Sequence, residues 1–343
     1  MASVAPLQKK FTLLESGKEF FGDFFEALDG AQETVLIKQF LWRNDATGRK
    51  VAERLLACLE RGVKVFIVKD RMGAFYEYGE GDGQSFFHDE PLRDSFFALH
   101  SLATVYLQAH FLFSRFYKNS VCKQIKNPLR AALVNHPLAR VMDAYKLYDH
   151  SKIVVIDGRL AYLGGVGFAD EFNEAEGKWL DYMVKMTDAA SVQELMYGLA
   201  GEPNSFRMES YTRILEVIHE AKEELVIEMP FVGHPAYIGA LVGAAERGVE
   251  VHLNLPLKAP SHHYRNLHFL KTLFRRAGRD AKHLHVALSP RIVHGKSIVS
   301  DGKLALFGSQ NLHMDPSVLR EMTLETADGN FAFDLRERLL EPV

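Results

Sequence analysis

The chain has 343 residues, 47% of them hydrophobic and 25% charged, which is typical of a soluble globular protein with one large or two medium domains. Its net charge of -3 excludes a uniformly basic surface for nucleic acid, and two cysteines, Cys58 and Cys122, exclude a disulfide framework. No apolar signal core or long apolar run occurs, so we expect a cytoplasmic protein that at most lies peripherally on the inner face of a membrane.

Helices and strands are predicted to alternate from the start of the chain. The Phe20, Phe21, Phe24, Phe25 and Leu28 stripe indicates a helix with one buried face. Short links between the elements favour an α/β fold with a parallel sheet. The predicted elements are a helix over 11–30, a strand over 34–40, a helix over 48–61 and a strand over 63–68.

The same order recurs in the second half of the chain. Glu60-Arg61-Gly62-Val63 is repeated letter for letter as Glu246-Arg247-Gly248-Val249. We therefore predict two homologous lobes, at 1–202 and 203–343, each a mixed, mostly parallel sheet flanked by helices. The second set of predicted elements is a helix over 210–221, a strand over 223–229, a helix over 236–247 and a strand over 249–255.

A hairpin near the end of the second lobe gathers polar side chains. His294 and Lys296 are two residues apart on a predicted strand, so their side chains share a face. Asp301-Gly302 is a strong hairpin signal, and the return strand brings Ser309 and Asn311 back to the same end. An imidazole, an ammonium, a hydroxyl and an amide in one place suit a phosphate group.

The first lobe carries the same device. His150 and Lys152 are followed by Asp157-Gly158 and then by Gly164, Gly165 and Gly167. The aspartate follows the histidine by seven residues in both copies. Agreement at so many positions favours two related half-sites over two unrelated structural hairpins.

The first lobe is longer than the second between the repeat and its hairpin. Gly62 and His150 are 88 positions apart, whereas Gly248 and His294 are 46 apart. We place the extra residues within 103–146, where basic and aromatic side chains mix. This composition fits contact with anionic lipid, or else a helical hairpin packed on the lobe with its basic residues in water. The basic residues are Arg115, Lys118, Lys123, Lys126, Arg130, Arg140 and Lys146.

Two further segments follow predicted strands. The segment 73–90 is rich in glycine, acids and aromatics, and we interpret it as a loop near the site. His262 and His263 are adjacent, so their side chains point apart and make poor co-ligands. We interpret the pair as ordinary loop residues.

Taken together, the two hairpins resemble the paired motifs of the phospholipase D superfamily, and the chain most resembles bacterial cardiolipin synthases within it. The resemblance implies one active site between the lobes, about a pseudo-twofold axis, with no metal or cofactor. It implies that His150 attacks phosphorus to form a phosphohistidine, that His294 is the general acid, and that Lys152 and Lys296 neutralise the phosphate.

The resemblance also assigns supporting residues. Asp181 and Glu321, each opening a predicted strand, are expected to hold the histidines in the right tautomer. Phosphate contacts are expected from Ser309, Asn311, Gly165 and Gly167, although the family usually has asparagine where this chain has Gly167. Asp157 and Asp301 are expected to form turns and to take no part in the chemistry.

The function implied is phosphodiester transfer on a phosphatidylglycerol-like lipid, to an alcohol as in cardiolipin synthesis or to water as in phospholipase D hydrolysis. A metal-independent nuclease is a second reading, which the net charge and the acidic stretch 79–90 disfavour. A third is a phospholipid-binding protein without turnover.

Overall fold

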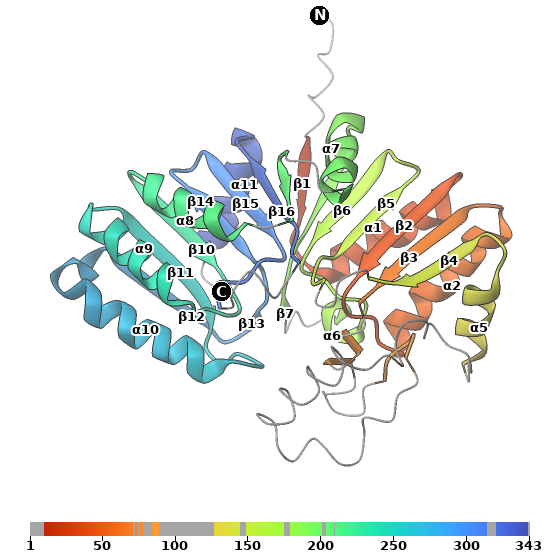
Figure 1. Ribbon diagram of the computed structural model, residues 1–343, viewed down its shortest axis with the longest axis horizontal. Helices are drawn as coiled ribbons and strands as arrows, with labels where there is room; N and C mark the ends of the chain where they lie inside the picture. The colour runs from red at the N-terminus through yellow and green to blue at the C-terminus, as the bar shows by residue number, and fades with distance from the viewer. Residues whose placement is uncertain are drawn as a thin grey trace, which may run out of the picture.

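Two seven-stranded sheets form the centre of the computed structural model, one in each lobe (Figure 1). The structure describes residues 10–70, 73–74, 76–77, 84–88, 127–144, 149–174, 179–200, 204–208, 210–313 and 320–341. Every strand of the first sheet precedes residue 202 and every strand of the second follows it. This division of the strands is consistent with the predicted lobe boundary at 202, which stays a prediction.

The two sheets have the same topology. The first has the order β1-β8-β6-β5-β2-β3-β4 and the second β12-β11-β10-β14-β15-β16-β9. The bounds in the first are β1 Phe11–Leu14, β2 Thr34–Gln39, β3 Lys64–Lys69, β4 Ala139–Asp143, β5 Ile153–Ile156, β6 Leu160–Gly164 and β8 Met183–Met186. Those in the second are β9 Phe206–Arg207, β10 Glu224–Glu228, β11 Glu250–Pro256, β12 Leu284–Ser289, β14 Ser297–Ser300, β15 Leu304–Gly308 and β16 Thr323–Thr326.

Both sheets are mixed, as predicted, but the prediction that they are mostly parallel is wrong. Only the β2-β3-β4 and β10-β11-β12 pairings are parallel, and the other four pairings in each sheet are antiparallel. Antiparallel neighbours can be joined by tight turns, whereas parallel ones need a crossover. The hairpins that carry His150 and His294 and the strands that pair with them supply the antiparallel part.

Helices cover the outer face of each sheet (Figure 1). The stripe of phenylalanines is buried as expected, but the predicted helix over 11–30 begins late. Residues 11–14 form β1, and the helix starts after Ser16, whose side chain accepts the N–H of Glu19 at 3.1 Å. The outer helices are α1 Gly17–Gly30, α2 Ala46–Glu60 and α5 Pro128–Asn135 in the first lobe and α8 Tyr211–Glu220, α9 Pro235–Glu246 and α10 His263–Ala277 in the second.

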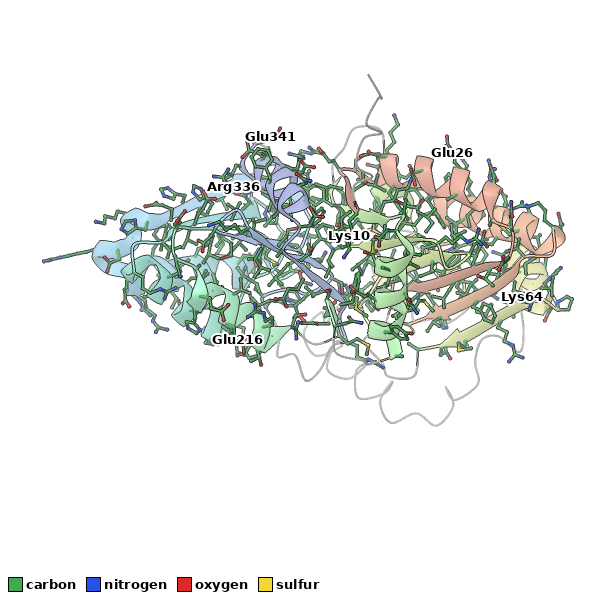
Figure 2. The ribbon with its side chains drawn as sticks, turned by 90° about the horizontal axis from the view of Figure 1, so that it is seen from above. Lys10, Glu26, Lys64, Glu216, Arg336 and Glu341 are labelled. Carbon is green, nitrogen blue, oxygen red and sulfur yellow. The ribbon has the colours of Figure 1, made fainter. Side chains whose placement is uncertain are left out.

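The inner faces of the two sheets pack against each other. Along β5, Val154 and Ile156 face the helices of their own lobe, while Ile153 and Val155 join a core that includes Val299 of the other lobe. Helices α7 Ala189–Ala200 and α11 Gly329–Leu340 add to this shared core. Figure 2 shows the result from above, with α1 and Glu26 in one lobe and α8 and Glu216 in the other.

The C-terminal part of the predicted insert belongs to the repeated unit. Helix α5 and strand β4 occupy the region 127–143, and β4 pairs in parallel with β3 as β12 pairs with β11. Arg130 is fully buried and donates to the carbonyl of Phe86 at 3.1 Å, so it is not a solvated basic residue. Residues 103–126 and Lys146 lie outside the described residues. Within the described residues, no helix has the length and apolarity needed to cross a membrane.

Asp157 and Asp301 occupy equivalent hairpin turns. Each has a positive φ, 51° and 53°, and each is followed by a glycine that also has a positive φ. The carboxylate of Asp157 accepts the backbone N–H groups of residues 32–34, and that of Asp301 accepts those of residues 222–224. Both carboxylates thereby fix the loop that precedes the first parallel strand of their lobe.

Candidate active site

The two hairpins bring His150 and His294 to one place between the lobes, and backbone contacts from the opposite lobe hold each histidine. The N–H of His150 donates to the carbonyl of Arg320 at 2.8 Å, and the N–H of His294 donates to that of Leu180 at 2.6 Å. A short sheet of β7 Trp179–Leu180 and β13 Ile292–Val293 adds a second link. The position of each imidazole therefore depends on both halves of the chain.

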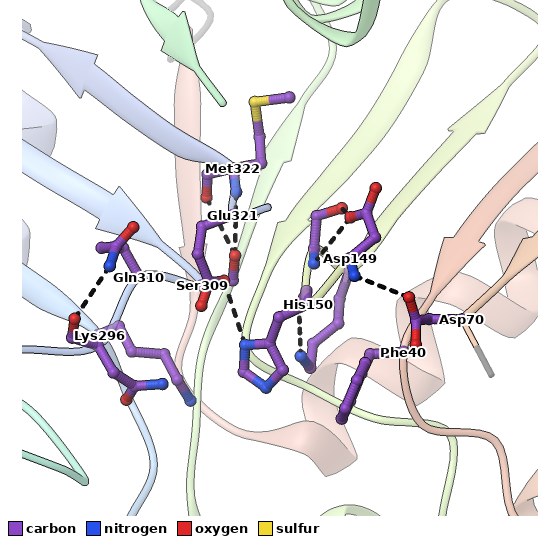
Figure 3. A network of polar contacts seen from close by, with 12 residues as sticks. Phe40, Asp70, Asp149, His150, Lys296, Ser309, Gln310, Glu321 and Met322 are labelled. Carbon is purple, nitrogen blue, oxygen red and sulfur yellow. Dashed lines mark hydrogen bonds and ion pairs between the residues drawn. The ribbon is translucent and has the colours of Figure 1, made fainter. Parts of the chain in front are cut away.

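The predicted acids contact the histidines across the lobe boundary. Glu321 of the second lobe places Oε2 3.1 Å from Nδ1 of His150 (Figure 3), and Asp181 of the first lobe places Oδ2 2.6 Å from Nδ1 of His294. Both acids are almost fully buried. A carboxylate at Nδ1 favours the tautomer with its proton on Nδ1, which leaves Nε2 with a free lone pair.

Lys152 and Lys296 are buried beside the histidines, with 2% and 3% of their surface exposed. Lys152 Nζ donates to the carbonyl of His150 at 2.7 Å, and Lys296 Nζ donates in the same way to that of His294. Burial, and then the charge of Lys296, lowers the pKa of Lys152 to about 7. Burial also lowers the pKa of Lys296, to about 8. Two poorly solvated ammonium groups make a strong attraction for an anion.

Both imidazoles are neutral near pH 7. Burial, followed by the charge of Lys296, lowers the pKa of His294 to about 3. Burial and then Lys152 lower the pKa of His150 as well. A neutral imidazole with a free Nε2 is the form that attacks phosphorus, and an anionic ligand beside these groups would favour protonation of the other ring.

The two half-sites differ in how the acid is supported. In the second lobe, Oγ of Ser309 accepts the N–H of Met322 at 3.0 Å (Figure 3), whereas in the first lobe Oδ1 of Asp181 accepts the N–H of Tyr182 at 3.0 Å. A Cβ on Gly165 would lie 2.0 Å from Oδ1 of Asp181. The first lobe therefore combines the shorter acid Asp181 with Gly165, whereas the second lobe combines the longer acid Glu321 with Ser309.

The predicted phosphate contacts of Ser309 and Gly165 stay predictions, and both groups already make hydrogen bonds within the fold. The hydroxyl of Ser309 is fully buried and accepts the N–H of Met322, and the N–H of Gly165 donates to the carbonyl of Tyr182 at 3.1 Å. Both hydrogen bonds stabilise the strand that follows the acid. Gly167 lies against Phe172 and Leu41, which a Cβ would approach to 2.9 and 3.2 Å. Asn311 does line the pocket between the lobes.

The pocket that contains both histidines is walled mainly by apolar and aromatic side chains. Tyr76 belongs to the predicted loop 73–90, which therefore borders the site, while half of that segment lies outside the described residues. His262 also lines the pocket, so its interpretation as an ordinary loop residue is wrong. The lining consists of Phe40, Leu41, Tyr76, His150, Lys152, Glu171, Phe172, Trp179, Phe231, Pro260, Ser261, His262, His294, Asn311 and His313.

Several charged groups near the site were not predicted from the sequence, because most of them lie far from the two motifs along the chain. Lys38 and Asp149 form an ion pair of 2.6 Å in the first lobe, and the N–H of Asp149 donates to Asp70 at 2.7 Å (Figure 3). Glu228 occupies the position in β10 that Lys38 occupies in β2, and it is fully buried near Lys296 and Asp181. Burial raises the pKa of Glu228 to about 7.

Two lobes of the same topology bring His150, Lys152 and His294 to one pocket, with Lys296 buried beside His294, and this arrangement suits the transfer of phosphodiesters. Residues 214–340 match the family model described as "Cardiolipin synthase, PLD-like domain". The chain is 26% identical to cardiolipin synthase A of Pseudomonas putida, over 96% of this chain and 67% of that protein. It is 24% identical to cardiolipin synthase B of Escherichia coli O6:H1, over 96% of this chain and 79% of that protein.

A solved structure agrees with these matches. The crystal structure of phosphatidylserine synthase from Haemophilus influenzae Rd KW20 superimposes with a TM-score of 0.65 at 14% identity, covering 97% of this chain and 86% of that one. This likeness shows a shared fold. Over nearly its whole length the chain is similar to cardiolipin synthases, and the phospholipase D-like family model matches its second lobe. The chain spans about two thirds of the length of the Pseudomonas cardiolipin synthases that it matches.

Proposed function

We propose that the protein transfers the phosphatidyl group of a phosphatidylglycerol-like lipid through a phosphohistidine, to an alcohol or to water. The observation that carries this proposal is the pair of neutral imidazoles, each backed at Nδ1 by a buried acid from the opposite lobe, with two buried lysines beside them. Names of the matched relatives supply the lipid class.

The reaction takes two displacements at phosphorus. Nε2 of His150 forms a bond to phosphorus as the bond to the head-group oxygen breaks, and His294, protonated once the anionic substrate is bound, gives its proton to that oxygen. His294 then takes a proton from the incoming alcohol or water, whose oxygen displaces His150. Lys152 and Lys296 stabilise the charge on the non-bridging oxygens. No cofactor or metal takes part in this scheme.

The order of the two histidines has a direct test. A p-nitrophenyl phosphodiester has a leaving group that needs no proton, so a variant that lacks only the acid still forms the phosphoenzyme. His294→Ala should release a burst of one nitrophenolate per enzyme and retain a phosphohistidine, while His150→Ala should give neither. A burst from His150→Ala alone would reverse the assignment.

The pocket wall favours lipid over nucleic acid. Among the described residues that line it, Lys152 is the one lysine or arginine, and aromatic rings make up much of the rest. A nuclease groove is basic along its length because it follows a phosphate backbone. Aromatic and apolar walls suit a single head group joined to an acylated glycerol.

The experiment that tests the function is product analysis with phosphatidylglycerol vesicles in the presence of a chelator, with His150→Ala and His294→Ala as controls. Cardiolipin with free glycerol would support a synthase, and phosphatidic acid alone would support a hydrolase. Cleavage of oligonucleotides without turnover of any lipid would favour the nuclease, and binding without turnover would favour the non-catalytic reading.

We propose further that the protein acts while peripherally bound to the inner face of an anionic membrane. This hypothesis depends on the sequence between 103 and 126, which lies outside the described residues. Charge reversal at Lys118, Lys123 and Lys126 should weaken binding to vesicles that contain phosphatidylglycerol. Unchanged binding would contradict this role for the segment.

A further inference from the structure

Three rings of the second lobe form one wall of the pocket. The ring centres of His262 and His313 are 4.8 Å apart, and Phe231 contacts both, at 5.4 and 5.5 Å. All three residues line the same pocket as His150 and His294. This wall, which we call the histidine wall, consists of Phe231, His262 and His313.

A network of hydrogen bonds fixes the backbone of the histidine wall. The side chain of Asn266 accepts the N–H of Val232 at 3.0 Å and donates to the carbonyl of Pro230 at 2.8 Å, on either side of Phe231. The N–H of Leu312, next to His313, donates to the carbonyl of Phe231 at 3.2 Å. The wall is therefore built before any ligand arrives.

His262 holds a conformation that costs free energy. Its φ is 55° and its ψ 18°, in the left-handed region, at the residue that precedes α10. Its side chain makes no capping hydrogen bond to the helix. A residue other than glycine is rarely found in this region, and such strain is concentrated at functional sites.

The imidazole nitrogens of the wall, unlike its backbone carbonyls, have no hydrogen-bond partner among the described residues. In the part of the chain that the structure describes, neither imidazole of the wall makes a side-chain hydrogen bond, although only 8% of His313 is exposed. Burial lowers the pKa of both groups, so both rings are neutral near pH 7. A neutral imidazole offers one N–H donor and one acceptor, which is what an alcohol hydroxyl needs.

We propose that His262 and His313 select the acceptor, by binding a hydroxyl of a polyol that lies beside the one that attacks phosphorus. This inference rests on the proposed function and specifies the acceptor class as a vicinal diol or glycerol group. The lysines and catalytic histidines bind the charged phosphate, so the neutral rings of His262 and His313 remain available to bind an uncharged hydroxyl of the acceptor. A site that bonds a hydroxyl discriminates strongly against an acceptor that lacks it, because its polar atoms are then left unpaired.

The test compares glycerol with 1-propanol, which has the attacking hydroxyl but no neighbour. With phosphatidylglycerol vesicles, transfer is counted as isotopically labelled glycerol or 1-propanol incorporated into lipid, relative to phosphatidic acid. The label is needed because transfer to glycerol forms phosphatidylglycerol again. His262→Leu and His313→Leu should each lower the glycerol-to-water ratio about tenfold, while the propanol-to-water ratio stays within about twofold. His268→Leu, at an exposed position on α10, the helix that follows His262, is the matched control and should change neither ratio.

Each other outcome overturns a stated part. An equal loss of the glycerol and propanol ratios would show that the histidine wall only supports the packing of the pocket. An unchanged glycerol ratio would show that the wall does not bind the acceptor. If a leucine variant fails to fold, as judged by its melting temperature, the asparagine variant at that position takes its place. Absence of turnover by the wild-type protein would overturn the proposed function, whereas normal turnover with unchanged ratios would overturn only this inference.

Discussion

Asp181 lies in the first lobe, yet its Oδ2 is 2.6 Å from Nδ1 of His294 in the second. Glu321 and His150 repeat this relationship in the opposite direction at 3.1 Å. Neither lobe therefore holds a complete histidine–carboxylate pair, and the pairs exist only while the inner faces of the two sheets are packed together. The extensive core shared by those faces is thus a requirement of the site as well as of the fold.

The first prediction concerns this crossed pair. Asp181→Asn should lower kcat by about 10²–10⁴-fold with little change in melting temperature, because an amide donor at Nδ1 favours the wrong tautomer of His294. The rate is measured on vesicles, and the pH profile of the variant is compared with that of the wild type. A structural role alone would lower stability and leave the pH profile in place.

Glu60→Gln is the matched control, since Glu60 is exposed at the end of α2 and far from the site in the fold. It should leave both the rate and the pH profile unchanged. Asp181→Glu keeps the charge but not the length and should recover only part of the activity. Full activity of Asp181→Asn would show that the contact with His294 is not needed.

The second prediction concerns alkaline pH. Lys152 and Lys296, with pKa values of about 7 and about 8, lose their charge as pH rises through this range, whereas an ordinary lysine keeps it to about 10.4. The value of kcat/KM should therefore fall above about pH 8. Bound phosphodiester stabilises the ammonium form, so the fall in kcat should come at higher pH. A kcat/KM that stays constant to pH 9.5 would contradict the argument.

Much of the site could be predicted from sequence because it resides in short, repeated motifs. His150, Lys152, His294 and Lys296 are indicated by the repeated motif and its hairpin turn. The prediction that they lie on strands is wrong, because they come just before β5 and β14. The histidine wall could not be found in this way, because His262 reaches the pocket only through an unusual backbone conformation and a helix far from the motif. The pairing of each acid with a histidine of the other lobe depends on how the lobes pack. The spacing of residues along the sequence does not show this packing.

The errors in the fold have a similar origin. The parallel part of each sheet follows from helix–strand alternation, but its larger antiparallel part depends on the pairing of strands distant in sequence, such as β1 with β8. The phosphate role of Ser309 stays a prediction, because a hydroxyl at the end of a motif can equally stabilise the backbone of the next strand. The backbone of Met322 takes up that hydroxyl here.

The third prediction separates stability from chemistry at the hairpin turns. Partial burial raises the pKa of Asp301, but three backbone N–H groups outweigh that effect and hold the pKa below its ordinary value. Asp301→Ala should lower the free energy of unfolding by about 1–3 kcal/mol, while activity per folded molecule is retained. The stabilisation should be present above about pH 4 and lost as pH falls through the depressed pKa. Urea unfolding at pH 7 measures the loss, and a large fall in kcat would contradict a purely structural role.

The fourth prediction concerns the buried carboxyl group of Glu228. Its pKa is raised by burial to about 7, so folding is most favourable when it is protonated, and stability is lost as pH rises from 4.5 through 7. Glu228→Gln resembles the protonated form and should be more stable than the wild type at pH 8, by an amount on the order of 1–3 kcal/mol. The two proteins should be nearly equal at pH 4.5. A constant difference between these pH values would show that Glu228 does not titrate.

The last prediction tests the exchange between Gly165 with Asp181 and Ser309 with Glu321. The variant Gly165→Ser gives the first lobe the serine that the second lobe has at Ser309. It should impair activity, because the new Cβ would lie 2.0 Å from Oδ1 of Asp181 and push the carboxylate away from His294. The loss should approach that of Asp181→Asn, and the double variant Gly165→Ser/Asp181→Asn should be little worse than either single one, because both act on the same contact.

The matched control for this exchange is Gly22→Ser, which places the same side chain on α1 at a glycine with nothing within 4 Å of a Cβ. It should leave kcat unchanged. Additive losses in the Gly165→Ser/Asp181→Asn double variant would mean that Gly165 acts through something other than Asp181. If the two substitutions act independently, a direct contact between Gly165 and the phosphate would be favoured. The hydrogen bond from the N–H of Gly165 to Tyr182 would then not prevent that contact.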